Sequence, residues 1–566
     1  MCSSDKSPSS HDDSTQFRRS RFGSSTGRLS WWFPLAGFVS LLWFLARVIP
    51  RPSRAAYPCQ QVAAPLAGGF VVWIAGLISS VFAYRKGIFM LSRSRIALAG
   101  ACLVGASILG FVTLMAAPDP MVMASPATTN DPIGEAKGVN PGRVVWVHDA
   151  DATDWDGPGD GHWWEPEHTR QVAVDLMMSR AIRYLAGEGD EQGAWDALFR
   201  HFNVTHGNGD VGYIVGEKIA IKVNFVGFLD TGDSGNVDPI TYDLVDRLDY
   251  MNTSPQMMLA LLRQLVNVVG VSQADITIGD PVALFPNQYY DPLFAEFPNI
   301  CYLDSRGWFN RTGMSPSSVD FYWSNRPSNV TQDKVLTSFA EATYFINLAN
   351  LKSHSGGGVT LCGKNYYGWL RRPPIAGYYN MHDSLPSQDP TSGSYRCMVD
   401  LMGHAHSGGK ALLYLVDGLY AGVHPDEDAP IPWDFAPFNG DWTSSLFASQ
   451  DPVAIDSVGF DFLQEEGDPR LYPQMAAADD YLIEAAQANA PPSGTFYDPD
   501  HGSSVSRLTS LGVHEHWNNS VDMQYSRNLD PVGGQGIELV IVRNGLLFED
   551  GFESGDPSFW SGVVGG

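Results

Sequence analysis

Cysteine is scarce in this sequence. The 566 residues contain six cysteines, and none of them forms a Cys-x-x-Cys pair. Structural zinc ribbons and cysteine-ligated iron–sulfur clusters need such closely spaced pairs, so we expect neither. Cys301, Cys362 and Cys397 lie far from the N-terminus and leave at least one thiol free, even if two of them form a disulfide.

Positive charge is scarce in most of the chain. The formal net charge is −26, from 36 Lys and Arg against 62 Asp and Glu. Residues 1–117 hold 12 of the basic residues and 3 of the acidic ones, which leaves 24 basic and 59 acidic residues, a net of −35, in residues 118–566. A surface this acidic repels nucleic acid, so we expect no nucleic-acid partner.

Charged residues are rare in three apolar runs near the N-terminus. The runs cover residues 31–49, 65–84 and 96–117, and about 20 apolar residues are enough to cross the ~30 Å hydrocarbon core as a helix. A cleaved signal peptide has a single, shorter apolar region. The sequence therefore predicts a basic arm over residues 1–29 and a three-span membrane anchor over residues 30–117.

Basic residues predict how this anchor is oriented. The arm carries five Lys and Arg, whereas no Lys or Arg occurs between Arg95 and Lys137. Because cytoplasmic loops are enriched in Lys and Arg, we expect the arm inside and the rest of the chain outside. Arg51 and Arg54 conflict with this model, since it places them outside as well. If the first run only dips into the membrane, the N-terminus lies outside too.

Strand-like and helix-like segments alternate after a Pro-, Ala-, Thr- and Gly-rich linker over residues 118–142. The expected strands are 143–148, 218–225, 275–279, 342–348 and 411–416, and the expected helices are 170–186, 256–269 and 453–463. This alternation predicts an α/β domain over residues 143–535, with a mainly parallel sheet flanked by helices and preceded by three transmembrane helices. An acidic, aromatic tail over residues 536–566 follows.

One stretch, residues 348–370, concentrates Lys352, His354 and Lys364 among five glycines. Glycines let a backbone expose its N–H groups to an anion, as phosphate-binding loops do. The segment GVTLCGKN departs from the Walker motif because Asn365 replaces the metal-binding Ser or Thr, so nucleotide hydrolysis is disfavoured. The alternative is a glycine turn with surface lysines.

Other polar residues follow the predicted strands: Lys222, Asn224, Asp280 and Asp417. Ligands bind beyond the carboxyl ends of parallel strands, which lie at one edge of the sheet. We therefore expect Lys222, His354, Lys364 and Asp417 to share one cleft, within roughly 10 Å of one another, about one Debye length in 0.1 M salt. Carboxylates or a bound anion must offset the repulsion between the ammonium groups.

Four segments resemble the bacterial family called domain of unknown function 362. They are IKVNF (221–225), LANLKSHSGGGVTLCGKNYYG (348–368), LVDGLYAG (415–422) and ASQDPVAIDSVGFDFL (448–463). The apolar spans followed by RVIPRPSRAAYPCQ resemble a membrane-anchored branch of that family. The resemblance implies a bacterial inner-membrane protein with its large domain on the extracytoplasmic side. Members with a ferredoxin-type cluster carry extra cysteine motifs, which this chain lacks.

These patterns lead to two functional hypotheses. The first is an enzyme that acts on an anionic small molecule with a divalent metal. Its catalytic residues are His354, Lys364 and Lys222; its substrate-binding residues are Lys352, Gly357, Gly358, Asn365 and Asn224; its metal ligands are Asp417, Asp451 and Asp456. The rival is a non-catalytic binding or scaffold protein of the cell envelope that uses the same pocket.

Several weaker patterns leave alternatives open. His404 and His406 have a metal-binding spacing, and His382, Asp383 and Asp400 could complete a ligand set. Asp451 precedes a proline and is also a natural helix N-cap. The acidic run 148–165 has calcium-loop spacing, but Pro158 stands where an oxygen ligand belongs. Residues 546–562 resemble a short C-terminal segment of secreted bacterial proteins.

Overall fold

A computed structural model describes residues 85–86, 88–89, 129–230, 236–325, 333–371, 379–424, 429–468, 470–471, 479–501 and 507–543. The chain divides into two compact units, residues 1–122 and 123–566. The predicted arm, the three predicted spans and residues 546–562 lie outside the described residues. Within the described part, no helix has the length and apolar character needed to cross a membrane.

The described part of the second unit is built around a ten-stranded sheet. Its strands are, in spatial order, β15 (Glu538–Arg543), β2 (Arg143–His148), β13 (Ser445–Ser449), β12 (Ala411–His424), β9 (Tyr344–His354), β3 (Ile219–Lys222), β4 (Ile276–Gly279), β5 (Cys301–Asp304) and β6 (Thr312–Gly313), with β10 (Gly358–Thr360) on β9. Among the described strands of this sheet, β13 and β10 are the ones that pair antiparallel to their neighbours. The predicted mainly parallel α/β sheet is confirmed.

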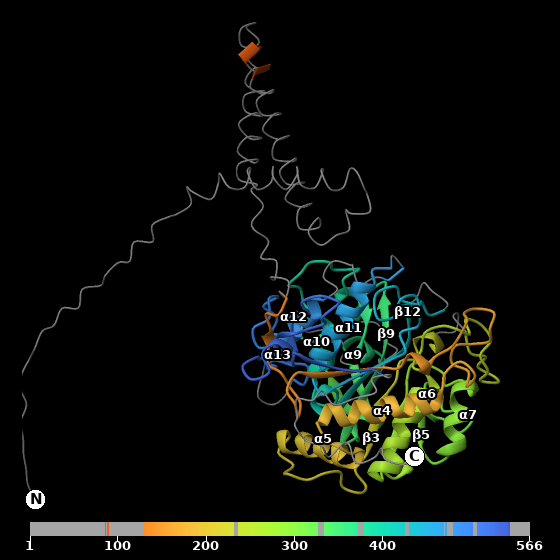
Figure 1. The fold of residues 1–566 in the computed structure, drawn as a ribbon. Helices are drawn as coiled ribbons and strands as arrows, with labels where there is room; N and C mark the ends of the chain where they lie inside the picture. Colours follow the sequence, from red (N-terminus) through yellow and green to blue (C-terminus); the bar gives the residue numbers. More distant parts are fainter. Residues whose placement is uncertain are drawn as a thin grey trace, which may run out of the picture. The chain divides into compact units, whose positions relative to one another are not determined.

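Helices cover both faces of this sheet (Figure 1). One layer contains α4 (Gln171–Ala186), α5 (Glu191–Thr205), α6 (Pro255–Arg263) and α7 (Asn287–Glu296); the other contains α9 (Cys362–Asn365), α10 (Cys397–Gly403), α11 (Pro452–Glu466) and α12 (Asp480–Ala486). Side chains alternate between the faces of a strand. In β2, Val145 and Val147 pack in the hydrophobic core on the side of α4–α7, and Val144 and Trp146 in the core on the side of α9–α12.

Smaller elements complete the domain, and two strands lie outside the range 143–535 that the sequence predicts for it. A three-stranded sheet joins β11 (Leu370–Arg371), β8 (Asp333–Leu336) and β7 (Pro316–Phe321), and the short helices include α8 (Thr337–Ala340) and α13 (Ser526–Leu529). In the expected linker, β1 (Ile133–Gly134) pairs with β14 (Val513–His514). In the expected tail, β15 pairs with β2. β1 and β15 are therefore parts of the folded domain.

Two strands run further than the sequence predicts. The strand expected over 342–348 continues to His354, and the one expected over 411–416 continues through Asp417 to His424. The helix expected over 256–269 is α6 followed by a π-helical segment, Gln264–Val269, which ends at Gly270 with a positive φ of 83°. The longer β9 carries Lys352 and His354 to the edge of the sheet, where the candidate site lies.

Candidate functional site

A cavity of about 330 Å³ opens beyond the carboxyl ends of β3, β4 and β9. The polar residues that line it include Asn224, Asp280, His354, Thr360, Lys364 and His382. Residues up to 177 positions apart, from Asn224 to Leu401, thus meet at one edge of the sheet, as expected for parallel strands. Of the four residues predicted to share one cleft, His354 and Lys364 line it, whereas the prediction is wrong for Lys222 and Asp417, which do not. Lys222 contacts the cavity wall through Asp280, and Asp417 does not line the cavity.

The glycine-rich turn orients His354. β9 ends at His354 and pairs with β10, and Gly358 closes the turn with a φ of +80°. The backbone N–H groups of Gly356 and Gly357 donate to His354 Nδ1 at 2.8 and 3.0 Å. Since Nδ1 accepts these bonds, the hydrogen of the neutral ring is on Nε2. Gly357 and Gly358 are buried, do not line the cavity and build the turn that holds the imidazole.

Asp456 fixes the position of α9, which carries Lys364 and Asn365. Its carboxylate accepts the N–H groups of Cys362 and Gly363 at 2.8 and 2.7 Å, and the hydroxyl of Tyr481 at 3.0 Å. These N–H groups belong to the first turn of α9 and have no partner within the helix. Asp456 on α11 therefore ties α9 to the neighbouring helix and sets where Lys364 enters the cavity.

Three lysines lie at or just behind the cavity wall, and all are buried. Lys222, Lys352 and Lys364 are 1%, 0% and 9% exposed. Lys222 Nζ lies 2.8 Å from Asp280 Oδ2. Lys352 Nζ donates to the backbone oxygen of Met251 at 2.6 Å, and Lys364 Nζ lies 3.7 Å from the centre of the Tyr367 ring. Among the described residues, the contact between Lys222 and Asp280 is the one ion pair that these three lysines form.

Burial lowers the pKa of each of these ammonium groups, because the charged form is poorly solvated. The pKa of Lys364 falls from 10.5 to about 8, mainly through burial, with repulsion from Lys222 adding to the effect. The pKa of Lys352 is lowered further, by burial and by repulsion from Lys364. Burial also lowers the pKa of Lys222, although Asp280 opposes this shift. A group with a pKa near 8 exchanges its proton readily near neutral pH.

A relay of asparagine amides fixes the orientation of Asn224. Asn224 Nδ2 donates to Asn365 Oδ1 at 3.1 Å, and Asn365 Nδ2 donates to Asn347 Oδ1 at 2.8 Å. Asn347 Nδ2 in turn donates to the backbone oxygen of Cys362 at 3.0 Å. Because Asn347 Nδ2 donates to a backbone oxygen, Asn347 Oδ1 is the acceptor for Asn365. In the same way, Asn365 Oδ1 is the acceptor for Asn224. The oxygen of Asn224, at the other end, is therefore left without a partner in the described structure.

Two buried polar atoms of the cavity wall lack a hydrogen-bond partner in the described structure. They are Asn224 Oδ1 and Thr360 Oγ1, on side chains that are 7% and 3% exposed. Buried polar atoms without a partner cost about 1–3 kcal/mol each, so they usually have one. An acceptor and a hydroxyl on two cavity-lining residues are therefore left unsatisfied in the described structure.

The structure does not bring the three predicted metal ligands together. Asp417 Oδ2 accepts the backbone N–H and the hydroxyl of Ser254, at 2.8 and 2.7 Å. Asp451 caps α11 by accepting the N–H groups of Val453 and Ala454. Asp456 holds α9. Each carboxylate is satisfied by a different part of the backbone, so these positions correct the expectation of a shared ion.

The weaker predicted metal sites also do not converge among the described residues. His404 Nε2 lies 3.2 Å from Asp500, while His382 lines the main cavity. Asp400 accepts bonds from Ser324 and Tyr395. The carboxylate of Glu165 in the acidic run accepts a backbone N–H within its own turn. Within the described residues, the one group of three metal-ligating side chains lies elsewhere: Asp479, His514 and His516. Cys301, Cys362 and Cys397 are all free thiols.

Several cavity residues were absent from the predicted site. Asp280 was expected at a strand end, yet its pairing with Lys222 depends on the adjacency of β3 and β4. Thr360 reaches the wall because β10 folds back on β9, where Thr360 lies opposite Lys352. Tyr366 and Tyr367, in the GKNYYG segment, also line the cavity. The glycine turn between His354 and Thr360 is the signal that could have identified this hairpin.

Residues 245–461 match the model of a family described as a domain of unknown function (DUF362). The matched part includes Asp280, β9, α9 and most of α11, and it supports the resemblance found in the sequence motifs. Lys222 and Asn224 precede the matched residues, as do the apolar runs. A comparison with curated proteins gives no match.

Proposed function

We propose that the cavity binds a small anionic molecule and that Lys364 transfers protons there. The observation that carries this proposal is the charge balance of the buried site. Three lysines adjoin the cavity, and one carboxylate, Asp280, pairs with them in the described part of the chain. An unpaired buried charge costs several kcal/mol, and a bound anion offsets that cost.

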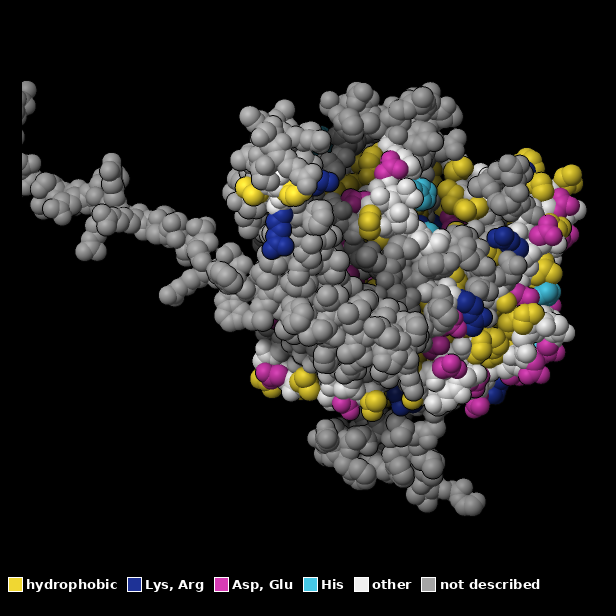
Figure 2. Space-filling view, turned by 90° about the horizontal axis from the view of Figure 1, so that it is seen from above, with side chains coloured by type: hydrophobic (Ala, Val, Ile, Leu, Met, Phe, Trp, Pro, Cys, Tyr) yellow, Lys and Arg dark blue, Asp and Glu magenta, His cyan; other side chains and the backbone are white. Residues whose placement is uncertain are grey.

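The charge inside the cavity differs from that of the surface. Figure 2 shows acidic and basic side chains interspersed over the described part of one face. Exposed charges act on a small anion only weakly, because solvent and salt screen them. The buried ammonium groups are less screened, which favours the cavity as the place of anion recognition.

The wall residues have complementary roles in this proposal. Lys364 and the Nε2–H of His354 donate to the anionic group, and Lys352 lies behind them with its Nζ bonded to the backbone oxygen of Met251. Asn224 Oδ1 accepts a hydrogen bond, so the ligand carries a hydroxyl or amine close to its anionic group. Asn365 holds Asn224 in this orientation through the amide relay.

Lys364 is the proton-transfer group of this proposal, and His354 is a donor. The pKa of Lys364, about 8, allows both of its forms near neutral pH. His354 Nδ1 already accepts two backbone N–H groups, so its ring would have to break these bonds to take up a proton there. Lys222 stays paired with Asp280 and orients the wall.

We also propose that the domain is held at a bacterial inner membrane and faces the extracytoplasmic side. The three apolar runs and the distribution of Lys and Arg support this location. A cysteine introduced at residue 130 and labelled in intact cells with an impermeant maleimide tests it. Labelling supports the proposal, whereas labelling only after the cells are broken contradicts it.

A ligand screen tests the proposed function. The full chain, purified in detergent, is incubated with phosphorylated and carboxylic metabolites, and the rise in Tm identifies binders. Lys364→Met should abolish the rise, whereas the control Lys218→Met, a half-exposed lysine paired with Glu341, should leave it unchanged. Equal rises in Tm in both variants would show that the ligand does not bind in the cavity.

The rival function, an envelope binding protein without catalysis, makes the same prediction for the ligand screen. It also requires binding and its loss in Lys364→Met. Incubating the binders with the wild-type chain and analysing them by mass spectrometry separates the two. A chemically altered ligand that Lys364→Met does not produce supports the enzyme; an unaltered ligand supports the rival.

A further inference from the structure

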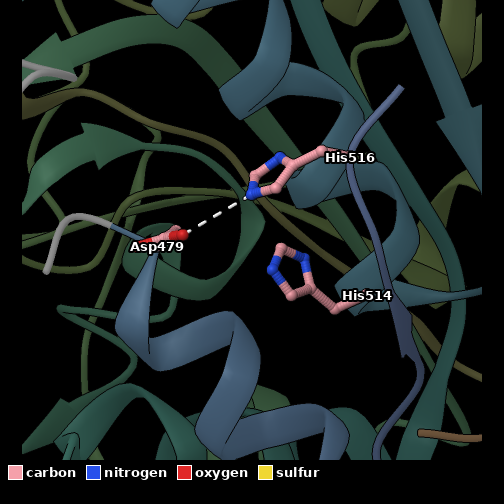
Figure 3. A group of neighbouring side chains, drawn as sticks. All are labelled: Asp479, His514 and His516. Atoms are coloured by element: carbon pink, nitrogen blue, oxygen red, sulfur yellow. Dashed lines mark ion pairs between the residues drawn. The ribbon is translucent and has the colours of Figure 1, made fainter. Parts of the chain in front are cut away.

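Two histidines and an aspartate form a cluster that shares no residue with the cavity. His514 ends β14, and His516 follows on the same extended segment, so both side chains face one side. Asp479 precedes α12 and faces both rings (Figure 3). One potential ligand atom from each residue lies within 4.8 Å of the other two. The two imidazole rings have centres 5.0 Å apart and are nearly perpendicular, at 80°.

The hydrogen bonds of His514 leave one nitrogen lone pair directed at this cluster. Its Nδ1 lies 2.8 Å from Ser457 Oγ, and that hydroxyl donates its hydrogen to the backbone oxygen of Val453 at 2.6 Å. Ser457 therefore accepts from His514, which places the ring hydrogen on Nδ1. Nε2 carries the lone pair, and it has no hydrogen-bond partner although the side chain is 0% exposed. In Figure 3 this nitrogen is on the side of the ring that faces Asp479.

His516 is oriented in the same way by a carboxylate. Its Nδ1 lies 2.5 Å from Asp461 Oδ1. Asp461 is itself held by the N–H of Trp517 at 3.0 Å and by the hydroxyl of Tyr525 at 2.8 Å. The second nitrogen, Nε2, lies 3.6 Å from Asp479 Oδ2 (Figure 3). Metal-binding histidines commonly donate their other N–H to a carboxylate in this manner, which fixes the ring and its tautomer.

We propose that Asp479, His514 and His516 bind a divalent transition metal ion, with Zn²⁺ as the best match. Imidazole and carboxylate ligands suit Zn²⁺, and two ligands about 2.0–2.1 Å from a tetrahedral ion lie about 3.3 Å apart. The observed 3.6 Å between His516 and Asp479 requires little movement to reach this value. His516 and Asp479 are 19% and 24% exposed, which leaves access for a water molecule as fourth ligand.

A simple ion pair does not explain the whole cluster. A protonated His516 between Asp461 and Asp479 accounts for the contacts of that ring. It leaves the Nε2 lone pair of His514 buried without a partner, beside a carboxylate that cannot donate to it. A metal ion satisfies this nitrogen, the second imidazole and the carboxylate together.

The ion would hold several separate elements of the domain. Asp479 adjoins α12, His514 is in β14, and Ser457 and Asp461 orient the two rings from α11. Two residues beyond Asp479, Tyr481 donates to Asp456, which holds α9. Metal binding should therefore stabilise the fold on this side of the sheet. This proposal rests on no residue of the anion cavity.

Metal analysis of the full chain in detergent tests the proposal. The chain is stripped with a chelator, dialysed against micromolar Zn²⁺, desalted and analysed by mass spectrometry of its metal content. We expect about one zinc per chain, and, with Co²⁺ as a probe, the visible absorption of a tetrahedral site. Asp479→Asn and His516→Gln should each lose the bound zinc. Asp461→Asn, which keeps all three ligands, should weaken binding by about 10–100-fold.

A matched control is available elsewhere in the domain. Asp249 pairs with His162 at 2.9 Å, so Asp249→Asn breaks a histidine–carboxylate pair outside the cluster and should leave zinc binding unchanged. Circular dichroism confirms that each variant is folded, and Zn²⁺ should raise the Tm of the wild type and of the control. A wild type that binds no zinc overturns the proposal, and so does a folded Asp479→Asn variant that binds zinc as the wild type does. If neither ligand variant folds, the Co²⁺ spectrum of the wild type is the test: the absorption of a tetrahedral site supports the proposal, and its absence contradicts it.

Discussion

Lys222 Nζ lies 2.8 Å from Asp280 Oδ2, and both side chains are almost fully buried. The two residues come from the ends of adjacent parallel strands, where Lys222 is in register with Gly279. Gly279 has a φ of +156°, and a Cβ there would lie 1.9 Å from the backbone oxygen of Leu303. The glycine thus permits the close packing that brings Asp280 beside the lysine. This pair neutralises Lys222, and among the described residues no carboxylate forms an ion pair with Lys352 or Lys364.

We expect Lys222 and Asp280 to be strongly coupled in stability. Lys222→Met should cost about 3–5 kcal/mol of unfolding free energy, because it leaves a buried carboxylate without its partner. Asp280→Asn should be similarly costly, and the double variant should cost clearly less than the sum of the two. Urea unfolding followed by circular dichroism measures the three values. The half-exposed pair Lys218–Glu341 is the control, and Lys218→Met should cost about 1 kcal/mol or less. Additive costs at Lys222 and Asp280 would contradict the coupling.

Anion binding should weaken as the pH rises through about 8. The pKa of Lys364 is lowered to about 8, mainly by burial, so this side chain loses its positive charge above that pH. Titration calorimetry with a ligand from the screen, at pH 6.5 to 9.5, measures the change. Lys364→Arg keeps its charge throughout, so any binding it retains should lose this pH dependence. A wild-type affinity that is constant across pH 8 would show that the Lys364 charge does not contribute.

In the ligand-free protein, the contribution of Lys364 to the unfolding free energy should rise with pH. Between about 8 and 10.5, Lys364 is largely deprotonated in the folded state, whereas it is protonated in the unfolded chain. The unfolded state binds more protons in this window, so the unfolding free energy contributed by Lys364 rises with pH. The difference in stability between wild type and Lys364→Met, followed by urea unfolding, should therefore shift in favour of the wild type from pH 8 to 10. A constant difference would contradict the lowered pKa.

The sequence predicted the main features of the fold because they depend on local patterns. Alternating apolar residues identified the strands, and polar residues at strand ends pointed to the edge where the cavity lies. The roles of individual site residues depend on contacts that no local pattern reveals. Asn224 and Asn365 are 141 positions apart, and their hydrogen bond decides which end of the Asn224 amide is left without a partner.

The histidine motifs illustrate the same limit. The chain contains His-x-His at 404–406 and again at 514–516, and the spacing is identical. Only the second motif meets a carboxylate that completes a group of three in the described structure, and that carboxylate, Asp479, is distant in sequence. Asp451 and Asp456 similarly resemble ligands in the sequence, yet their oxygens are occupied by backbone N–H groups.

Asp456→Asn should reduce both stability and anion binding. The carboxylate accepts N–H groups through both oxygens, and an asparagine would present its own NH₂ group to one of them. The lost hydrogen bond and the unfavourable contact between the asparagine NH₂ and a backbone N–H should together cost about 1–3 kcal/mol of unfolding free energy. The displaced α9 should also misplace Lys364, so the Kd of the anion should rise. Asp383→Asn, at an exposed residue, should change neither quantity. If Asp456 instead holds a divalent ion, the variant should lose bound metal, which chelation and metal analysis would reveal.

The unpartnered oxygen of Asn224 should decide which anions the cavity prefers. The asparagine relay directs Nδ2 at Asn365, so Oδ1 is available as an acceptor for a hydroxyl or amine of the ligand. An analogue that lacks this donor would leave the buried oxygen unsatisfied, at a cost of about 1–3 kcal/mol, or roughly 5–150-fold in affinity. Asn224→Leu has a similar size but no acceptor, so it should bind the ligand and its deoxy or deamino analogue with nearly equal affinity. Thr360→Val, which removes the other unpartnered atom, should retain the preference that Asn224 creates. Calorimetric Kd values for both ligands with the three proteins measure these ratios, and an undiminished preference in Asn224→Leu would show that another residue provides the acceptor.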